Sequence, residues 1–261
     1  MPSISFLGTG QGVPSEDRFF SSSVLRVAGL HLLVDAGEPC IHLLSDRGTL
    51  VSDLDVVLIT HGHVDHIGGL PALLQGCMLR KRIKRLPLYM PEEMIAPLKS
   101  WIHALYLTEE GLGFPLEWHA WKSGENVFMG AGVSVTSHSN SHLTSCYKDL
   151  PGADPSLPCS SYSLEITSDG FRCIFSGDLA DPAELAGLLK DPTSVLVSEL
   201  SHFSDTELAD VLRGTDLKVL CLVHLSDDYS EDRGELKARM EDLLPQLDDV
   251  LIPDDGEVLD F

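Results

Sequence analysis

The amino-acid sequence predicts a fold of the α/β class. Short apolar segments typical of buried strands alternate along the chain with helix-like segments. Several of the strand-like segments end in an acid or a histidine, and α/β proteins bind their ligands at strand ends. With 261 residues and 43% hydrophobic residues, the chain is long enough to bury a large core.

The first half of the chain begins with an alternating segment that ends at glycine, followed by two strand-like segments joined through Ala28-Gly29-Leu30. Helices are expected where apolar residues recur with helical spacing, one of them after Pro91. The expected strands are residues 3–8, 24–27, 31–34, 55–60 and 86–90. The expected helices are residues 40–50, 71–78 and 91–107.

The second half follows the same scheme. Ser168-Asp169-Gly170 joins two β-branched segments and predicts a hairpin. The expected strands are residues 133–136, 162–167, 172–175, 195–198 and 219–223. The expected helices are residues 182–190, 206–212 and 235–244.

The two halves resemble each other. LLVDAG at 32–37 matches CIFSGD at 173–178, and VVLITH at 56–61 matches VLCLVH at 219–224. Each is an apolar strand that delivers an acid or a histidine at its end. We therefore expect a single domain over residues 1–261, built of two similar halves at about 1–130 and 131–261.

The charge of the chain restricts its partners. There are 40 acidic and 18 basic residues, a net charge of −22, so the surface repels phosphate backbones at long range. The basic run at 80–85, RKRIKR, is the exception. It would either hold a phosphate or an RNA strand or be a solvated connection between a helix and a strand.

The cysteines and the N-terminus indicate a cytoplasmic protein. The six cysteines are isolated and form no CxxC pair, which favours buried thiols over disulfides. The first residues, MPSISFLGTG, contain neither a basic segment nor a long apolar one, so we expect no signal peptide. No stretch is apolar enough for a membrane span, and no membrane partner is expected.

A metal site is predicted where ITHGHVDHIGG (59–69) follows the apolar strand. At a strand end that turns into a helix, His61 and His63 can meet one cation, while Asp65 and His66 meet a second. Imidazole and carboxylate suit zinc, with manganese or iron as alternatives. Two cations about 3.5–4 Å apart can clamp the attacking and leaving oxygens of a displacement.

A dinuclear site needs further ligands, and the second half offers three at strand ends. They are His142, Asp178 and His224. His138, four residues before His142 in SHSNSH, is the alternative to His142. Asp55 and Glu199 are candidates to orient the ligand histidines through hydrogen bonds.

The motif HGHVDH, followed by His142, Asp178 and His224 in that order, resembles the signature of the metallo-β-lactamase fold superfamily. The resemblance covers nearly the whole chain and implies a four-layer αββα sandwich. Members of the superfamily cleave β-lactams, thioesters and phosphodiesters.

Four further segments resemble the ribonuclease Z branch of this superfamily: FLGTGQGVPS (6–15), GGLPALL (68–74), LVHLSDDY (222–229) and PDDGEVLDF (253–261). By this resemblance His61, His63 and His142 hold one zinc, and Asp65, His66 and His224 hold the other. Asp178 bridges them. Members of this branch are often homodimers.

The chain departs from ribonuclease Z in two places. Between His142 and Asp178 the chain offers only a polar, proline-rich loop (143–161) where ribonuclease Z carries a long arm that grips transfer RNA. The segment VSELSHFSD (197–205) is also shorter, and looks more like the arm-free phosphodiesterases that open cyclic phosphates. His202 is then the expected general acid, and Asp65 would orient the attacking water or take its proton.

The sequence thus predicts a dinuclear metal-dependent hydrolase, a phosphodiesterase acting on a small or cyclic phosphodiester or a nucleotide. The alternative is a transfer-RNA 3′-processing endoribonuclease, disfavoured by the charge and the missing arm. A thioester or lactone hydrolase and a non-catalytic binding module are further alternatives.

Overall fold

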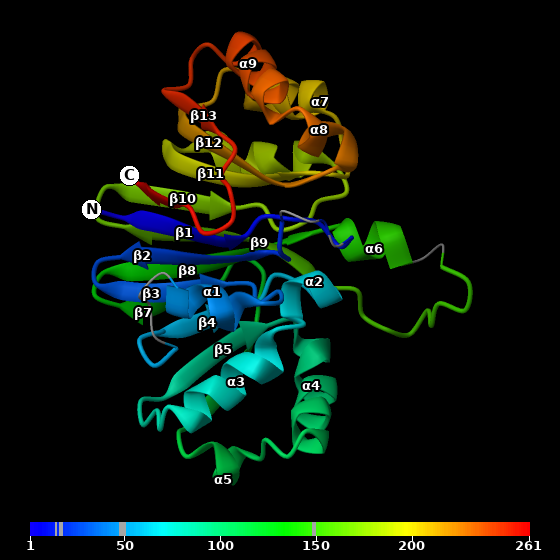
Figure 1. Ribbon diagram of the computed structural model, residues 1–261. Coiled ribbons are helices and arrows are strands. Elements are labelled where there is room, and N and C mark those ends of the chain that lie inside the picture. Colours follow the sequence, from blue (N-terminus) through cyan, green and yellow to red (C-terminus); the bar gives the residue numbers. More distant parts are fainter. Residues whose placement is uncertain (14, 16–17, 47–50, 148–149) are drawn as a thin grey trace. The chain divides into compact units, whose positions relative to one another are not determined.

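The computed structural model describes residues 1–261 except 14, 16–17, 47–50 and 148–149. The chain forms two compact units. Unit 1 comprises Met1–Trp121 and Asp254–Asp260, and unit 2 comprises Lys122–Pro253 and Phe261. Each unit contains one sheet with helices packed against it (Figure 1).

Unit 1 is built on a 7-stranded sheet in the order β14-β1-β2-β3-β4-β5-β6. Strands β14, β1, β2 and β3 pair antiparallel, whereas β3, β4, β5 and β6 pair parallel. The strands are β1 (Ser3–Gly8), β2 (Ser22–Val27), β3 (Leu30–Val34), β4 (Val56–Leu58), β5 (Leu86–Met90), β6 (Leu116–Ala120) and β14 (Val258–Asp260).

The helices of unit 1 pack against its sheet, with α1 beside β1 and α4 beside β6. They are α1 (Cys40–Asp46), α2 (Val64–Ile67), α3 (Leu70–Leu79), α4 (Glu92–Ala104) and α5 (Glu109–Leu112). A proline in the first turn of α3 starts the helix, and its buried face adds Leu73 and Leu74 to the core. That core also takes in Val57 of β4 and Leu88 of β5, so the strand before the HGHVDH motif is fixed by buried apolar contacts.

Unit 2 repeats the arrangement with a 7-stranded sheet in the order β13-β12-β11-β10-β9-β8-β7. Strands β7 to β10 pair antiparallel and β10 to β13 parallel. The strands are β7 (Asn126–Gly130), β8 (Val133–Asn140), β9 (Ser161–Ser168), β10 (Phe171–Phe175), β11 (Thr193–Leu200), β12 (Leu217–Leu225) and β13 (Asp249–Leu251).

The helices of unit 2 are α6 (His142–Tyr147), the 3₁₀ helix η1 (Pro182–Lys190), α7 (Asp205–Leu212), α8 (Asp227–Glu231) and α9 (Arg233–Leu243). A capping box between Ser204 and Glu207 starts α7. Leu208 and Leu212 of this helix pack in one core with Leu196 of β11 and Leu222 of β12. That core fixes β11, which His202 follows, and β12, which contains His224 near its end.

The predicted α/β class is confirmed, and the expected strands and helices lie within a few residues of the observed ones. The region 182–190 is a 3₁₀ helix instead of an α-helix. The last residues of the helix expected over 40–50 lie outside the described residues. Strands β6, β7, β13 and β14 and the short helices α2, α5, α6 and α8 were not predicted from the sequence.

The similarity of the halves is visible in strand order. Strands β3 and β10, which carry LLVDAG and CIFSGD, both occupy the fourth position of their sheets counted from β14 and β7. The second match does not hold, because β4 occupies the fifth position and β12 the sixth. The counterpart of β4 is β11, the strand that precedes Ser201 and His202.

The six cysteines, all within the described residues, form no disulfide bond. Four are buried, but Cys146 is exposed and Cys159 is partly exposed, so the expectation of burial is wrong for these two. Among the described residues, no helix has the length and hydrophobicity needed to cross a membrane.

Candidate metal centre

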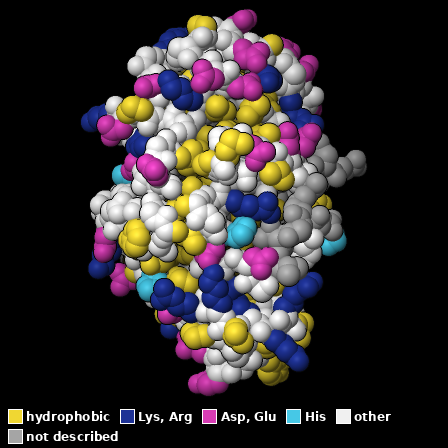
Figure 2. Space-filling view, turned by 90° about the vertical axis from the view of Figure 1, so that its left-hand side faces the viewer, with side chains coloured by type: hydrophobic (Ala, Val, Ile, Leu, Met, Phe, Trp, Pro, Cys, Tyr) yellow, Lys and Arg dark blue, Asp and Glu magenta, His cyan; other side chains and the backbone are white. Residues whose placement is uncertain are grey.

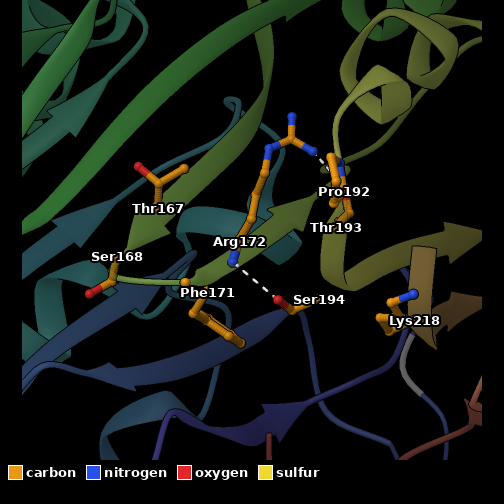
Figure 3. Close-up of a pocket in the computed structure, with 9 residues that line it drawn as sticks. Thr167, Ser168, Phe171, Arg172, Pro192, Thr193, Ser194 and Lys218 are labelled. Carbon is orange, nitrogen blue, oxygen red and sulfur yellow. Dashed lines mark hydrogen bonds between the residues drawn. The ribbon is translucent and has the colours of Figure 1, made fainter. Parts of the chain in front are cut away.

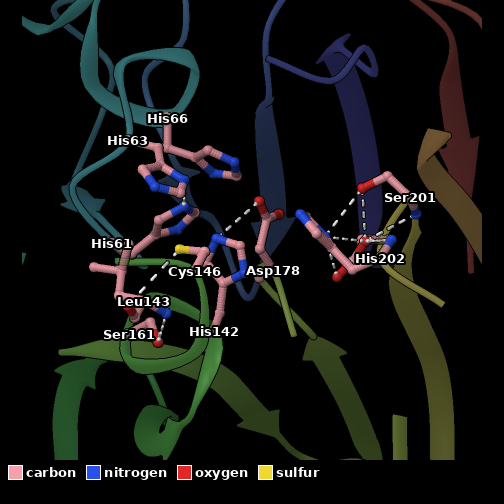
Figure 4. A network of polar contacts seen from close by, with 12 residues as sticks. His61, His63, His66, His142, Leu143, Cys146, Ser161, Asp178, Ser201 and His202 are labelled. Carbon is pink, nitrogen blue, oxygen red and sulfur yellow. Dashed lines mark hydrogen bonds and ion pairs between the residues drawn. The ribbon is translucent and has the colours of Figure 1, made fainter. Parts of the chain in front are cut away.

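Unit 1 places the first two motif histidines together. His61 is fully buried, and its Nε2 lies 3.1 Å from Nδ1 of His63. Two ring nitrogens at this separation can bind one cation. Figure 4 shows the rings of His61, His63 and His66 close to one another, with centroids 4.7 and 4.1 Å from that of His61.

The other two residues of the motif lie on α2. Asp65 and His66 are both buried, and Oδ2 of Asp65 lies 3.5 Å from Nε2 of His66. The turn after β3 packs directly on this helix: a Cβ at Gly37 would lie 2.3 Å from the Asp65 carbonyl oxygen. Only glycine allows this approach, and it holds the α2 backbone against the strand end.

Asp35 organises this half of the site, a role that was not predicted from the sequence. Its Oδ2 accepts a hydrogen bond from Nδ1 of His66 at 2.8 Å, and its Oδ1 accepts one from the Thr60 backbone N–H at 2.8 Å. A carboxylate on Nδ1 turns the Nε2 lone pair of the ring toward a metal. The available signal was the match of LLVDAG with CIFSGD, since each segment places an acid just after an apolar strand.

A tryptophan supports the strand end from the neighbouring strands. Trp121 is buried, and its Nε1–H donates to the carbonyl oxygen of Ile59 at 2.8 Å, two residues before His61. Its ring stacks on Tyr89, which stacks on His119, with centroids 4.9 and 4.5 Å apart. The hydrogen bond from Trp121 fixes the Ile59 peptide, directly before the HGHVDH motif begins.

Unit 2 brings its three predicted ligands together. Oδ2 of Asp178 lies 3.6 Å from Nε2 of His142 and 3.5 Å from Nε2 of His224, and all three residues are buried. One carboxylate oxygen thus faces two imidazole nitrogens. Buried carboxylate and imidazole groups in contact fit the requirements of a divalent cation.

Hydrogen bonds hold the ligands of unit 2 in place. The carboxylate of Glu184 accepts from both the N–H and the hydroxyl of Ser141, directly before His142. Oε1 of Glu199 accepts from the N–H of Leu179 at 2.7 Å, directly after Asp178. His224 has a φ of 50°, a left-handed conformation of the kind that strained functional sites retain.

His138 has a different partner. Its Nε2 lies 2.9 Å from Oε2 of Glu165, whose Oε1 accepts from Nε of Arg172 at 2.6 Å. Burial raises the pKa of Glu165, but the hydrogen bonds from Arg172 and His138 outweigh it, so the pKa lies below its ordinary value. Within unit 2, therefore, His142 contacts Asp178 and His138 belongs to a separate ion pair.

His202 lies beside the unit 2 ligands. Its ring centroid is 4.7 Å from that of His142 and 5.9 Å from that of His224, and 36% of its side chain is exposed. Its Nδ1 lies 2.9 Å from both carboxylate oxygens of the buried Glu199. Glu199 thus orients His202. The carboxylate of Asp55 instead accepts hydrogen bonds from the Lys84 side chain and from the backbone N–H of His31, neither of which belongs to a predicted ligand.

The basic run at 80–85 is largely structural. Arg82 is buried and donates to backbone carbonyl oxygens of Val51, Ser52, Leu54, Lys84 and Arg85. Burial lowers the pKa of this guanidinium. Lys84 pairs with Asp55, and Arg85 lies 3.6 Å from Glu117. Figure 2 shows Lys and Arg side chains gathered on the lower part of the drawn face, around this turn between α3 and β5.

Unit 2 also contains a cavity of about 440 Å³ at the start of β10 (Figure 3). Arg172, Ser194 and Lys218 are among its lining residues. The Arg172 guanidinium donates hydrogen bonds to Glu165 and to the carbonyl oxygen of Leu188, and so links β10 to β9 and to η1. Asp178 follows the opposite end of β10, so this cavity is not part of the candidate metal centre.

Two mixed sheets, each delivering buried histidines and aspartates at strand ends, define the class of protein as a metal-dependent hydrolase of the metallo-β-lactamase fold. Solved structures share the fold. YhfI from Bacillus subtilis matches with a TM-score of 0.77 and 18% identity, covering 100% of both chains. The short form of human tRNase Z matches with a TM-score of 0.73 and 19% identity, covering 99% of this chain and 98% of its own.

The chain belongs to the family described as anti-Pycsar protein Apyc1, whose model matches residues 2–238. It is also similar to the ribonuclease BN of Erwinia tasmaniensis, with 34% identity over 87% of this chain and 90% of the relative. The ribonuclease Z of Methanopyrus kandleri is 30% identical over 90% of each chain. The predicted ribonuclease Z-like branch of the metallo-β-lactamase superfamily is thereby confirmed.

Proposed function

We propose that this protein is a dinuclear metal-dependent phosphodiesterase that acts on a small or cyclic phosphodiester or a nucleotide. The observation that carries the proposal is the contact of Asp178 with both His142 and His224, next to the partly exposed His202. The two units would act together as one hydrolase domain.

Seven residues would hold the metals. His61, His63 and His142 would bind one ion, Asp65, His66 and His224 the other, and Asp178 both. The nitrogen and oxygen donors suit zinc, with manganese or iron as alternatives. When bound, the ions supply a Lewis acid for a phosphate oxygen and lower the pKa of bound water.

The protein side chains would supply the proton transfers. Asp65 would orient the attacking water. His202 would protonate the leaving oxygen, with its ring oriented by the Glu199 carboxylate at Nδ1. Protonation of the departing alkoxide accelerates the cleavage of an unactivated diester.

Charge favours a small substrate over transfer RNA. The net charge is −22, and much of the one basic run is engaged with backbone carbonyls, Asp55 and Glu117. Between His142 and Asp178 the described residues form α6, β9 and β10 with a loop between α6 and β9. The free thiols suit a reducing compartment such as the cytoplasm.

The alternative, transfer-RNA 3′ processing, is favoured by the names of the relatives, ribonuclease BN and ribonuclease Z, at 34% and 30% identity. Only a substrate test separates it from the leading proposal, because both reactions hydrolyse a phosphodiester at the same kind of metal centre.

The test measures hydrolysis of bis(p-nitrophenyl) phosphate, a panel of cyclic nucleotides and a precursor transfer RNA, with metal content determined on the same sample. Asp178→Ala removes the proposed bridging ligand, and Asp169→Ala, in the exposed turn between β9 and β10, is the matched control. We expect metal-dependent cleavage of the small diesters, lost only in Asp178→Ala. Cleavage of transfer RNA alone would select the alternative, and two bound metals without diester cleavage would direct the search to thioesters or lactones.

A further inference from the structure

Each unit contains a side-chain hydroxyl that lies between a carboxylate and the Nδ1 atom of a proposed metal-binding histidine. In unit 2 the hydroxyl belongs to Ser201, between Glu199 and His224. In unit 1 it belongs to Thr60, between Asp35 and His61. Neither hydroxyl was singled out in the sequence.

The geometry at Ser201 determines which group donates each proton. Its Oγ lies 2.9 Å from Oε2 of Glu199 and 2.9 Å from Nδ1 of His224. A carboxylate only accepts hydrogen bonds, so the single hydroxyl proton points to Glu199. The oxygen then accepts from His224, whose Nδ1 must carry the proton.

His202 does not compete for this hydroxyl proton. Its Nδ1 lies 3.0 Å from Oγ of Ser201 but 2.9 Å from both carboxylate oxygens of Glu199, to which it donates. Glu199 also accepts from the Ser201 N–H at 2.9 Å, which fixes the carboxylate relative to the serine. With the proton of His224 on Nδ1, the lone pair of the ring is on Nε2, the atom 3.5 Å from Asp178.

The geometry at Thr60 has the same consequence. Its Oγ1 lies 2.8 Å from Oδ2 of Asp35 and 3.1 Å from Nδ1 of His61. The hydroxyl donates to Asp35 and accepts from His61, so Nε2 of His61 carries the lone pair. This is the atom that meets Nδ1 of His63 at 3.1 Å.

The two hydroxyls follow corresponding strands, although the strand register matches Thr60 with Glu199 and not with Ser201. Thr60 follows β4 and Ser201 follows β11, and these strands occupy the same fifth position in the two sheets. Both hydroxyls belong to the residues at which the strand ends and the chain turns toward a helix. The recurrence indicates a shared task instead of two incidental contacts.

We propose that Ser201 and Thr60 are positioning residues that hold His224 and His61 in the Nδ1–H tautomer, so that each presents Nε2 to a metal. The tautomer follows from the contacts alone, and its consequence for metal binding rests on the proposed function. Loss of such a partner typically lowers metal affinity by about 10- to 100-fold.

The test reads the tautomer directly. Long-range ¹H–¹⁵N correlation spectra of the full chain, stripped of metal at a pH of about 8, distinguish Nδ1–H from Nε2–H in neutral imidazole. His224→Gln and His61→Gln assign the signals.

Ser201→Ala removes the hydroxyl and Ser201→Thr restores one. Ser226→Ala is the matched control, since Ser226 lies two residues after His224 and its side chain caps no helix N–H. Zinc affinity is measured on the same variants by competition with a chromogenic chelator.

We expect Nδ1–H signals for His224 and His61 in the parent chain. In Ser201→Ala the His224 signal should shift toward the other tautomer and zinc affinity should fall about 10- to 100-fold, whereas Ser201→Thr and Ser226→Ala should keep both properties. Thr60→Ala should have the same effect on His61 only. An Nε2–H signal for His224 in the parent chain would overturn the proposal, as would an unchanged tautomer in a folded Ser201→Ala. Both readouts are independent of diester cleavage, so they do not share the outcome of the substrate test.

Discussion

Oδ2 of Asp35 accepts a hydrogen bond from Nδ1 of His66 at 2.8 Å, and both side chains are buried. Asp35 follows β3 with a φ of 57°, a left-handed conformation that costs a non-glycine residue free energy. The contact joins this strand end to α2, the helix that carries Asp65 and His66. A residue outside the HGHVDH motif thus determines how the motif presents its last histidine.

Replacing this carboxylate tests the contact. Asp35→Asn should destabilise the protein by about 1–3 kcal/mol, because an amide cannot accept all the hydrogen bonds of Thr60 and His66. Metal content should fall as well. Urea unfolding and metal analysis measure the two effects, with the exposed Asp53→Asn as control. Full metal content in a folded Asp35→Asn would contradict the role given to Asp35.

His202→Ala should slow the cleavage of an unactivated diester, such as a cyclic nucleotide, by about 10²- to 10⁴-fold, the usual contribution of a general acid, with metal content unchanged. Glu199→Gln should also lower the rate, because an amide is a weaker acceptor for Nδ1 of His202 and holds the ring less firmly. Steady-state kinetics and metal analysis on one sample separate these effects. His138→Ala is the control, since His138 pairs with Glu165 and should leave the rate unchanged. Equal rates for His202→Ala and the parent chain would remove His202 from the mechanism.

Two arginines of the basic run should behave differently. Arg82→Ala should destabilise unit 1 by roughly 2–4 kcal/mol, because it leaves buried carbonyl oxygens without a donor. The exposed Arg80→Ala should stay within about 0.5 kcal/mol of the parent chain. Chemical unfolding measures both. A loss of activity in a stable Arg80→Ala would instead assign the run to substrate binding.

The ion pair of Glu165 should make stability depend on pH. Its pKa is lowered in the folded state by Arg172 and His138, against the effect of burial. The stabilisation is therefore fully present above the ordinary pKa of 4.5 and is lost as the pH falls through the folded-state value.

Urea unfolding of the parent chain and of Glu165→Gln checks this dependence. The difference in unfolding free energy between them should be largest at neutral pH and should shrink below a pH of about 4.5. Because other carboxylates titrate in both proteins, the comparison isolates Glu165. A difference that stays constant through this range would exclude the assigned cause.

Local patterns in the sequence were sufficient for the fold class and the order of most strands and helices. Apolar periodicity and turn residues act over short stretches, so the elements that end at His61, Asp178 and His224 could be predicted. The motif at 61–66 was similarly informative, because four ligand-type side chains within six residues are close in space in any compact backbone.

Contacts between distant residues could not be predicted in this way. Asp35 reaches His66 across 31 positions, and Ser201 reaches His224 across 23. The sequence left open whether the run at 80–85 faces solvent and whether His138 or His142 is a ligand. Packing decided that Arg82 turns inward and that His142, not His138, faces Asp178. The strand order of each sheet determines which side chains can form hydrogen bonds, because it brings together strand ends that are far apart in the sequence. The sequence by itself thus determined which side chains stand at the strand ends, and the tertiary structure decided which of them meet.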